Sequence, residues 1–235
     1  MVKSELIKRS PLRIFEKSLH GGLGKGNLGV LASRKGVGKT ACLVHIATDQ
    51  LLQDKHVIHV SFSAKVDHII SWYEDIFAEI AKKRDLEAAV EVHDEIIKNR
   101  VIMNFNRTGI DTEQILSSVK AMISDGHFAA DTVIFDGYDF DQVGESDLEK
   151  IKAFSEDSGI EVWFSVSLGE GDPVFDERGI PAQVKPFLDV ISVLITLRFE
   201  GDHVHFKAVK DHDDQKPVDM HLMLDPKTLL VAEEA

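Results

Sequence analysis

The chain has 235 residues and a formal net charge of −13, and 43% of its residues are hydrophobic. This composition is typical of a globular protein that is large enough to bury a sizeable core. The excess of acidic groups disfavours non-specific binding to nucleic acids and to anionic membranes.

Two further features of the composition predict where the protein is found. Its single cysteine, Cys42, excludes a disulfide within the chain and is typical of a reducing compartment. Residues 1–10 are charged and lack the apolar centre of a secretory signal, and no run of about eighteen apolar residues occurs that could cross a membrane. We therefore expect a cytoplasmic protein without a membrane partner.

Helices and strands are predicted to alternate along most of the chain. Residues 1–20 predict a helical leader, in which Ser10 caps a helix that has Pro11 as its first residue. The apolar periodicity then predicts strand 28–32, helix 40–52, strand 56–62, helix 66–82, helix 85–99, strand 101–105, helix 111–124 and strand 132–136.

The second half of the chain continues this alternation and ends in strands. Ser146 and Glu149 have the spacing of a capping box, which predicts that a helix starts there. Strand 160–167 follows, and the residues 168–186 predict a long loop. Four terminal strands are predicted at 190–199, 203–210, 219–224 and 228–232.

This order predicts an α/β fold in three layers. Several strands are apolar along their whole length, which is typical of a parallel sheet covered by helices on both faces. We expect one domain over residues 1–235, in which residues 211–235 form antiparallel edge strands and a tail. Ligands of such sheets bind where parallel strands end, so Asp136, Ser167 and the loop after strand 28–32 should converge on one site.

That loop carries the clearest motif of the sequence. Residues 33–40, here called the 33–40 loop, read Ser-Arg-Lys-Gly-Val-Gly-Lys-Thr and match the phosphate-binding (Walker A) pattern G-x-x-x-x-G-K-[ST] except that Ser33 replaces the first glycine. Backbone N–H groups and the start of the following helix would face the phosphates. The predicted contacts to ATP are Ser33, Arg34, Lys35, Gly36, Val37, Gly38, Lys39, Thr40 and Ala41. A solvated basic turn that matches by chance is the alternative.

Asp136 is the second half of the predicted site. It follows four apolar residues at the end of strand 132–136, where a carboxylate can hold Mg²⁺ directly or through water. Lys39 would reach the β- and γ-phosphates, and the Thr40 hydroxyl would bind the metal. The predicted catalytic residues are thus Lys39 and Asp136, the metal ligands are Thr40 and Asp136, and the cofactors are ATP and Mg²⁺. A carboxylate that only begins a polar turn is the alternative for Asp136.

These motifs, with the glycine-rich stretch 21–26 and the stretch 184–202, make the chain resemble the RecA superfamily of P-loop ATPases. The resemblance covers residues 11–212 and is closest to the branch of KaiC, RadA and DnaB. It implies a RecA-like nucleotide-binding domain that contacts ATP or ADP through Lys210 as well. Because relatives form rings or filaments, it also implies a homo-oligomer.

Three catalytic groups of that superfamily are replaced in this chain. Relatives have a glutamate base at Ser63, a glutamine or histidine that senses the γ-phosphate at Ser167, and an arginine at His212. A serine cannot take up a proton at neutral pH, and an arginine can contribute about 10³–10⁵ in rate. We therefore expect slow or absent hydrolysis, in a nucleotide-dependent regulatory or assembly module that acts on a protein partner.

Other interpretations stay open. Asp67 or Glu74 could supply the base, although the polar face of helix 66–82 explains both more simply. An active DNA-stimulated ATPase of recombination or replication is a second function, which the acidic loop 168–186 disfavours. A MinD- or ParA-like ATPase or a small-molecule kinase is a third, with Arg34 or Lys35 imitating an early loop lysine.

A separate metal site is conceivable near the end of the chain. His203 and His205 lie on one face of their predicted strand, and an acidic stretch follows at 211–214. Their spacing matches no zinc motif. A solvated strand face next to an acidic turn is the simpler interpretation.

Overall fold

The computed structural model of the chain describes residues 2–8, 10–63, 67–83, 89–105, 111–169 and 173–234. Within these residues, nine strands form one sheet. They are β1 (Leu28–Arg34), β2 (Val57–Ser61), β3 (Arg100–Asn104), β4 (Thr132–Asp136), β5 (Glu161–Leu168), β6 (Val193–Glu200), β7 (His203–Asp211), β8 (Val218–Leu224) and β9 (Val231–Glu233).

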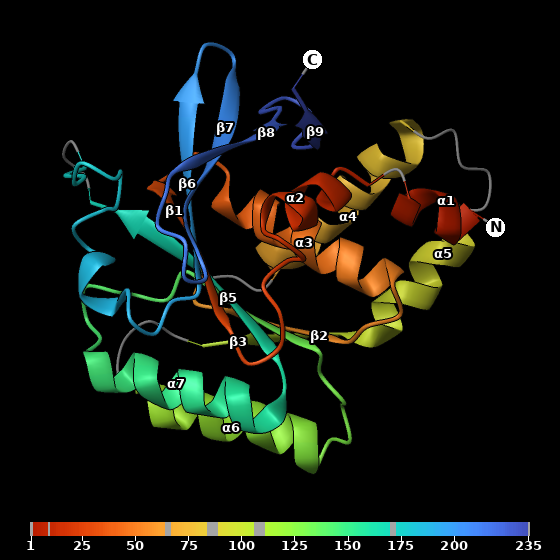
Figure 1. Cartoon of the computed structure of the whole chain (residues 1–235). Coiled ribbons are helices and arrows are strands. Elements are labelled where there is room, and N and C mark those ends of the chain that lie inside the picture. Colours follow the sequence, from red (N-terminus) through yellow and green to blue (C-terminus); the bar gives the residue numbers. More distant parts are fainter. Residues whose placement is uncertain are drawn as a thin grey trace.

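The sheet is parallel on one side and antiparallel on the other. Its order is β3-β2-β4-β5-β1-β6-β7-β8-β9 (Figure 1). The strands from β3 to β6 pair in parallel, whereas β7, β8 and β9 continue the sheet in antiparallel pairs. The predicted α/β fold with a mostly parallel sheet and antiparallel terminal strands is therefore confirmed.

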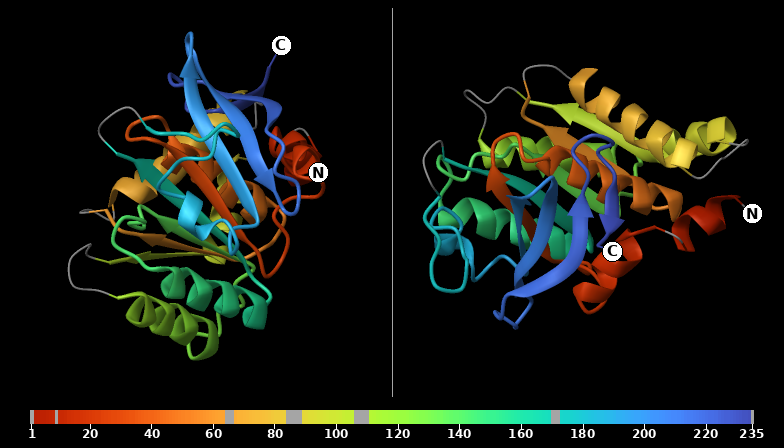
Figure 2. Two further views of the ribbon diagram at one scale, coloured as in Figure 1. Left: turned by 60° about the vertical axis from the view of Figure 1, so that its left-hand side comes forward. Right: turned by 90° about the horizontal axis from the view of Figure 1, so that it is seen from above.

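Helices lie on both faces of this sheet, which agrees with a three-layer arrangement. The helices are α1 (Val2–Lys8), α2 (Leu12–Ser18), α3 (Lys39–Leu52), α4 (Asp67–Lys83), α5 (Ala89–Ile96), α6 (Thr112–Ser124) and α7 (Glu145–Ser158), with short 3₁₀ helices at Ile97–Asn99 and Lys185–Phe187. α6 and α7 lie side by side on one face, opposite α3 and α4 (Figures 1 and 2). Two separate apolar clusters fill the two interfaces.

The central strands are buried because both of their faces are covered. Every residue of β2 and of β4 is buried, as the continuous apolar runs predict for a covered parallel sheet. Gly29 of β1 leaves space for the ring of Trp163 on the neighbouring strand β5. A Cβ atom at Gly29 would lie only 2.5 Å from Trp163 Cε3. The ring of Phe15 on α2 packs on the same indole, with centroids 5.7 Å apart.

The predicted starts of two helices need correction. α7 starts at Glu145 with Gly144 as its N-cap, and the Asp147 carboxylate accepts the Gly144 N–H at 3.1 Å. Ser146 and Glu149 therefore form no capping box. Pro11 takes the cap position of α2, while the Ser10 hydroxyl still accepts the Leu12 N–H at 3.2 Å.

Other predicted bounds shift by a few residues. The predicted helix 85–99 is α5 followed by a 3₁₀ turn, and its predicted residues 85–88 lie outside the described part of the chain. The leader 1–20 contains two helices, α1 and α2. Among the described residues, each helix is too short or too polar to cross a membrane.

Candidate functional site

The 33–40 loop connects β1 directly to α3. Gly36 and Gly38 have φ angles of +83° and +114°, in a region that L side chains rarely adopt. A side chain at Gly38 would also require the Leu224 side chain of β8 to shift, because a Cβ atom there would lie 2.4 Å from Leu224 Cδ2. The glycines of the motif are therefore required by the backbone of this turn.

Lys39 is folded back onto the loop. Its Nζ donates hydrogen bonds to the carbonyl oxygens of Ser33 and Arg34, at 3.1 and 3.0 Å, and its side chain is buried. Burial lowers the pKa of Lys39 to about 8, against the opposing charge of Asp136. An incoming anion would favour the charged ammonium, so this lysine can bind phosphate.

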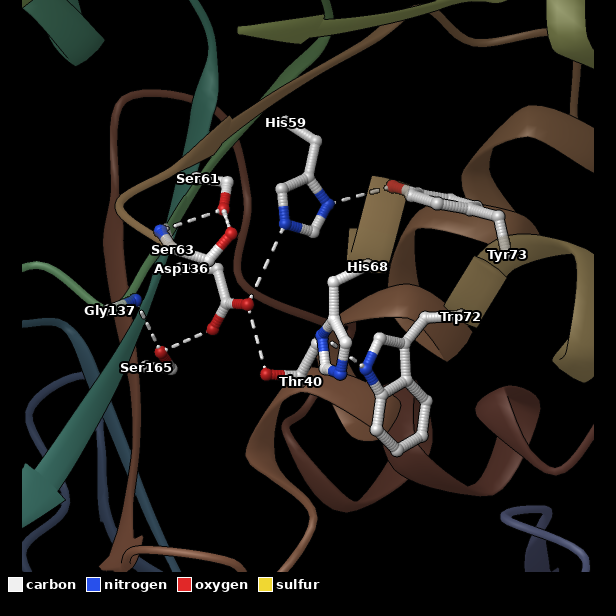
Figure 3. Close-up of polar contacts among 10 residues, drawn as sticks. All are labelled: Thr40, His59, Ser61, Ser63, His68, Trp72, Tyr73, Asp136, Gly137 and Ser165. Carbon is white, nitrogen blue, oxygen red and sulfur yellow. Dashed lines mark hydrogen bonds and ion pairs between the residues drawn. The ribbon is translucent and has the colours of Figure 1, made fainter. Parts of the chain in front are cut away.

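Asp136 lies at the centre of a polar cluster that joins three elements (Figure 3). The Thr40 hydroxyl of α3 donates to Asp136 Oδ2 at 2.9 Å, and the Ser165 hydroxyl of β5 donates to Oδ1 at 2.6 Å. The Gly137 N–H in turn donates to Ser165 Oγ at 2.8 Å. Each oxygen of this carboxylate is thus held in a fixed direction.

A buried histidine completes the cluster. His59 Nε2 lies 3.9 Å from Asp136 Oδ2, and its Nδ1 lies 3.0 Å from the hydroxyl of Tyr73 on α4 (Figure 3). Burial raises the pKa of Tyr73, so its hydroxyl keeps its proton and can donate to Nδ1. At 3.9 Å, Nε2 faces the carboxylate without a hydrogen bond.

These contacts keep Asp136 ionised. Burial alone would raise its pKa, but the contacts with His59, Ser165 and Thr40 hold the pKa below its usual value. An ionised carboxylate beside a hydroxyl is a pair of hard oxygen donors, the ligand type that Mg²⁺ prefers. The residues present therefore fit a magnesium ion bound between α3 and β4.

The predicted contacts of the 33–40 loop differ in exposure. Ser33, Lys39 and Ala41 are buried, and Arg34, Lys35 and Gly36 are exposed, with the remaining three half-buried. Ser167 pairs with Ser33 in the parallel register of β5 and β1, so it lies beside the loop as predicted. Ser63 follows β2, and its hydroxyl accepts a hydrogen bond from Ser61 at 3.0 Å.

Lys210 and His212 do not join this cluster. Lys210 Nζ donates to the carbonyl oxygens of Leu188 and Ile191, both at 2.5 Å, and His212 Nε2 lies 3.0 Å from the carbonyl oxygen of Leu23. Lys210 pairs with Leu194 near the start of β6. This is the amino end of the parallel strands, whereas the 33–40 loop follows the carboxyl end of β1. Within one chain, Lys210 is therefore separated from the 33–40 loop by the length of the parallel strands.

Of the two alternative bases, Glu74 is separated from the 33–40 loop and Asp67 is exposed. Glu74 lies 2.7 Å from His93 Nε2 and 3.9 Å from a guanidinium nitrogen of Arg100, the first residue of β3. Glu74, on α4, thus lies near the amino end of the parallel strands. Asp67 is the exposed first residue of α4.

The metal site considered at His203, His205 and the stretch 211–214 is not assembled. His203 is the first residue of β7 and Asp211 the last, so the length of a nine-residue strand separates them. His205 instead contacts the Glu234 carboxylate through Nδ1.

The sequence reasoning missed His59, Tyr73 and Ser165. His59 and Ser165 are polar residues inside otherwise apolar strands, and this interruption of the pattern is the signal that could have identified them. Ser165 pairs directly with Asp136 in the parallel register of β5 and β4. Tyr73 gave no such signal, because it belongs to the apolar stripe of its helix.

A cavity of about 240 Å³ lies beyond this cluster, where β4 ends. It is lined by Phe62, Asp111, Thr112, Ile115, Gly137, Tyr138, Asp139, Gln142, Val143 and Asp147. Its three carboxylates make it unfavourable for phosphate groups. The cationic 33–40 loop is the better place for an anionic ligand.

Neither the models of known protein families nor the sequences of curated proteins match this chain. A functional assignment therefore depends on the motif and on the geometry around Asp136.

Proposed function

We propose that the chain is a RecA-like P-loop protein that binds Mg²⁺-ATP at the 33–40 loop and hydrolyses it slowly or not at all. The observation that carries this proposal is the 2.9 Å hydrogen bond from Thr40 Oγ1 to Asp136 Oδ2, between residues 96 positions apart. These are the two groups that the motif predicts as magnesium ligands. Their contact supports the interpretation of both.

Each residue of the cluster has a role in this proposal. Bound Mg²⁺ would neutralise phosphate charge, with Thr40 and Asp136 as its protein ligands. Lys39 would turn from the Ser33 and Arg34 carbonyls toward the phosphates. His59 and Ser165 would keep the Asp136 carboxylate ionised and oriented.

Slow hydrolysis follows from the replacement of the expected catalytic groups and from their places in the fold. Ser63 stands at the position of the expected base, and a serine hydroxyl does not accept a proton at neutral pH. Lys210 and His212 are held by main-chain carbonyl oxygens at the other end of the strands. Nucleotide occupancy would then control a conformation, an assembly of several copies or the binding of a protein partner.

Calorimetric titration of Mg²⁺-ATP into the protein tests the proposal. We expect saturable binding without the sustained heat of turnover. Lys39→Ala should weaken binding by at least about tenfold, because a hydrogen bond to a charged group contributes about 1.5–3 kcal/mol. Lys207→Ala, which removes an exposed lysine of β7, is the matched control and should bind like the wild type.

Two outcomes would contradict the proposal in different ways. Absence of binding, or equal binding by Lys39→Ala and the wild type, would exclude a nucleotide site at the 33–40 loop. A sustained heat that requires Lys39 would keep the nucleotide site but exclude slow hydrolysis. Asp136→Asn separates the role of the metal, since it should reduce the gain in ATP affinity that Mg²⁺ provides over EDTA.

A further inference from the structure

Metal-ligating side chains gather at the terminal edge of the sheet, outside the cluster around Asp136. Asp219 and His221 belong to β8, and Glu234 directly follows β9. One ligand atom from each lies within 4.8 Å of the other two. We propose that these residues bind a divalent transition-metal ion of the Zn²⁺ type.

The backbone brings the three side chains together. The Glu234 N–H donates to the His221 carbonyl oxygen at 3.0 Å, and the His221 N–H donates to Asp219 Oδ1 at 2.9 Å. His221 has a φ of +50°, in the left-handed region, where the pairing of β7 with β8 is irregular. The ligands are therefore positioned by main-chain contacts that need no metal.

A second histidine orients one of the carboxylates. His205 Nδ1 on β7 contacts Glu234 Oε1, while Oε2 lies 3.7 Å from His221 Nδ1. Carboxylate ligands in metal sites are commonly held by such a second contact. His205 would thus act as a positioning residue, and the metal would bind Oε2 of Glu234.

The donor set decides between classes of metal ion. One imidazole nitrogen and two carboxylate oxygens suit Zn²⁺, whereas Ca²⁺ and Mg²⁺ prefer oxygen ligands throughout. Zinc ligands lie about 2.0–2.2 Å from the ion, so two of them are at most about 4.4 Å apart. The His221 side chain is 76% exposed and Asp219 is exposed as well, so both can rotate the short distance inward.

A bound ion would connect β8 to the segment after β9. β9 is three residues long and pairs with β8 alone among the described strands. Because the metal binds only the folded arrangement, it should stabilise this edge, and above the dissociation constant the gain should rise with the logarithm of the metal concentration.

The experiment uses the full chain after treatment with EDTA and removal of the chelator. Zn²⁺ is titrated by calorimetry, and Co²⁺ is added separately to record its visible absorption. We expect one zinc ion per chain and a Co²⁺ spectrum with nitrogen and oxygen ligands. His221→Ala and Asp219→Asn should each weaken zinc binding by at least about tenfold.

His203→Ala is the matched control, because His203 begins β7, the strand next to β8, and does not belong to the three-ligand group. It should bind zinc like the wild type, and far-ultraviolet circular dichroism should show that all variants remain folded. Equal binding by His221→Ala and the wild type would mean adventitious surface binding only, and would overturn the proposal. Absence of zinc binding by the wild type would overturn it as well.

Discussion

His45 shows how one buried imidazole connects distant parts of the chain. It lies on α3, and its Nε2 is 2.9 Å from the Leu229 carbonyl oxygen and 3.3 Å from the Val231 nitrogen. Burial lowers its pKa to about 4, although the Leu229 carbonyl acts in the opposite direction. The helix that carries Lys39 is therefore joined to β9 by a histidine that is neutral at pH 7.

Acid should destabilise the protein through this residue. The unfolded histidine has a pKa of 6.5 and the folded one about 4, so between these values the unfolded state binds more protons. The free energy of unfolding should thus fall by about 3 kcal/mol as the pH is lowered through this window. Denaturant unfolding from pH 6.5 to 4 measures this loss in the wild type and in His45→Leu, which lacks the group. Identical pH slopes for the two proteins would contradict the prediction.

The candidate site was predictable only where a local pattern defines it. Lys39 and Thr40 follow from the spacing of the loop motif, and Asp136 follows from its place after an apolar strand. Ser165 reaches the same carboxylate through the pairing of two strands, which the local sequence does not encode. The separation of Lys210 from the loop was not predictable from local patterns, because it depends on the direction of β7.

The 33–40 loop, as an element, depends on its contact with β8. Gly36 and Gly38 both have positive φ angles, but they differ in their surroundings. A Cβ atom at Gly36 meets nothing within 4 Å, whereas one at Gly38 lies 2.4 Å from the buried Leu224 side chain.

This difference predicts unequal effects of two alanine substitutions. Gly36→Ala and Gly38→Ala should each lose about 1–2 kcal/mol of stability from the left-handed backbone. Gly38→Ala should lose more and should also weaken Mg²⁺-ATP binding more strongly, because the buried Leu224 side chain must shift to relieve the clash. Thermal unfolding and calorimetry measure both effects. Equal losses would show that Leu224 does not constrain the loop.

The helix starts show where local patterns are insufficient. The spacing of Ser146 and Glu149 is that of a capping box, yet both residues lie within the first turns of α7. The chain arrives from β4 with Gly144 extended, and Asp147 supplies the carboxylate that accepts its N–H. The path of the chain before α7 thus favours the cap formed by Gly144 and Asp147 over the overlapping spacing of Ser146 and Glu149.

At the scale of the whole molecule, the order of helices and strands was easier to predict than the sheet. Continuous apolar runs indicated a covered parallel sheet, and β2 and β4 are indeed buried throughout. The position of β1 between β5 and β6 could not be obtained in this way. Strand order depends on how distant segments pair, and apolar periodicity describes only one segment at a time.

The net charge of −13 predicts weak affinity for nucleic acid. Single-stranded DNA should not bind detectably even at about 50 mM salt, where phosphate contacts are strongest, because 40 acidic groups outnumber 27 basic ones and repel its phosphates. Fluorescence anisotropy of a labelled oligonucleotide, with and without Mg²⁺-ATP, measures this. Micromolar binding that weakens with salt would instead favour the DNA-stimulated ATPase.

The contacts between α3 and the terminal strands also constrain the order of folding during synthesis. His45 bonds to a carbonyl 184 residues later in the chain, and Gly38 packs against Leu224. A ribosome therefore releases the 33–40 loop long before it makes the segment that covers it. The contacts of α3 and of the loop with the terminal strands can form only after β8 and β9 have emerged, so we expect nucleotide binding by the nascent chain to become strongest late in translation.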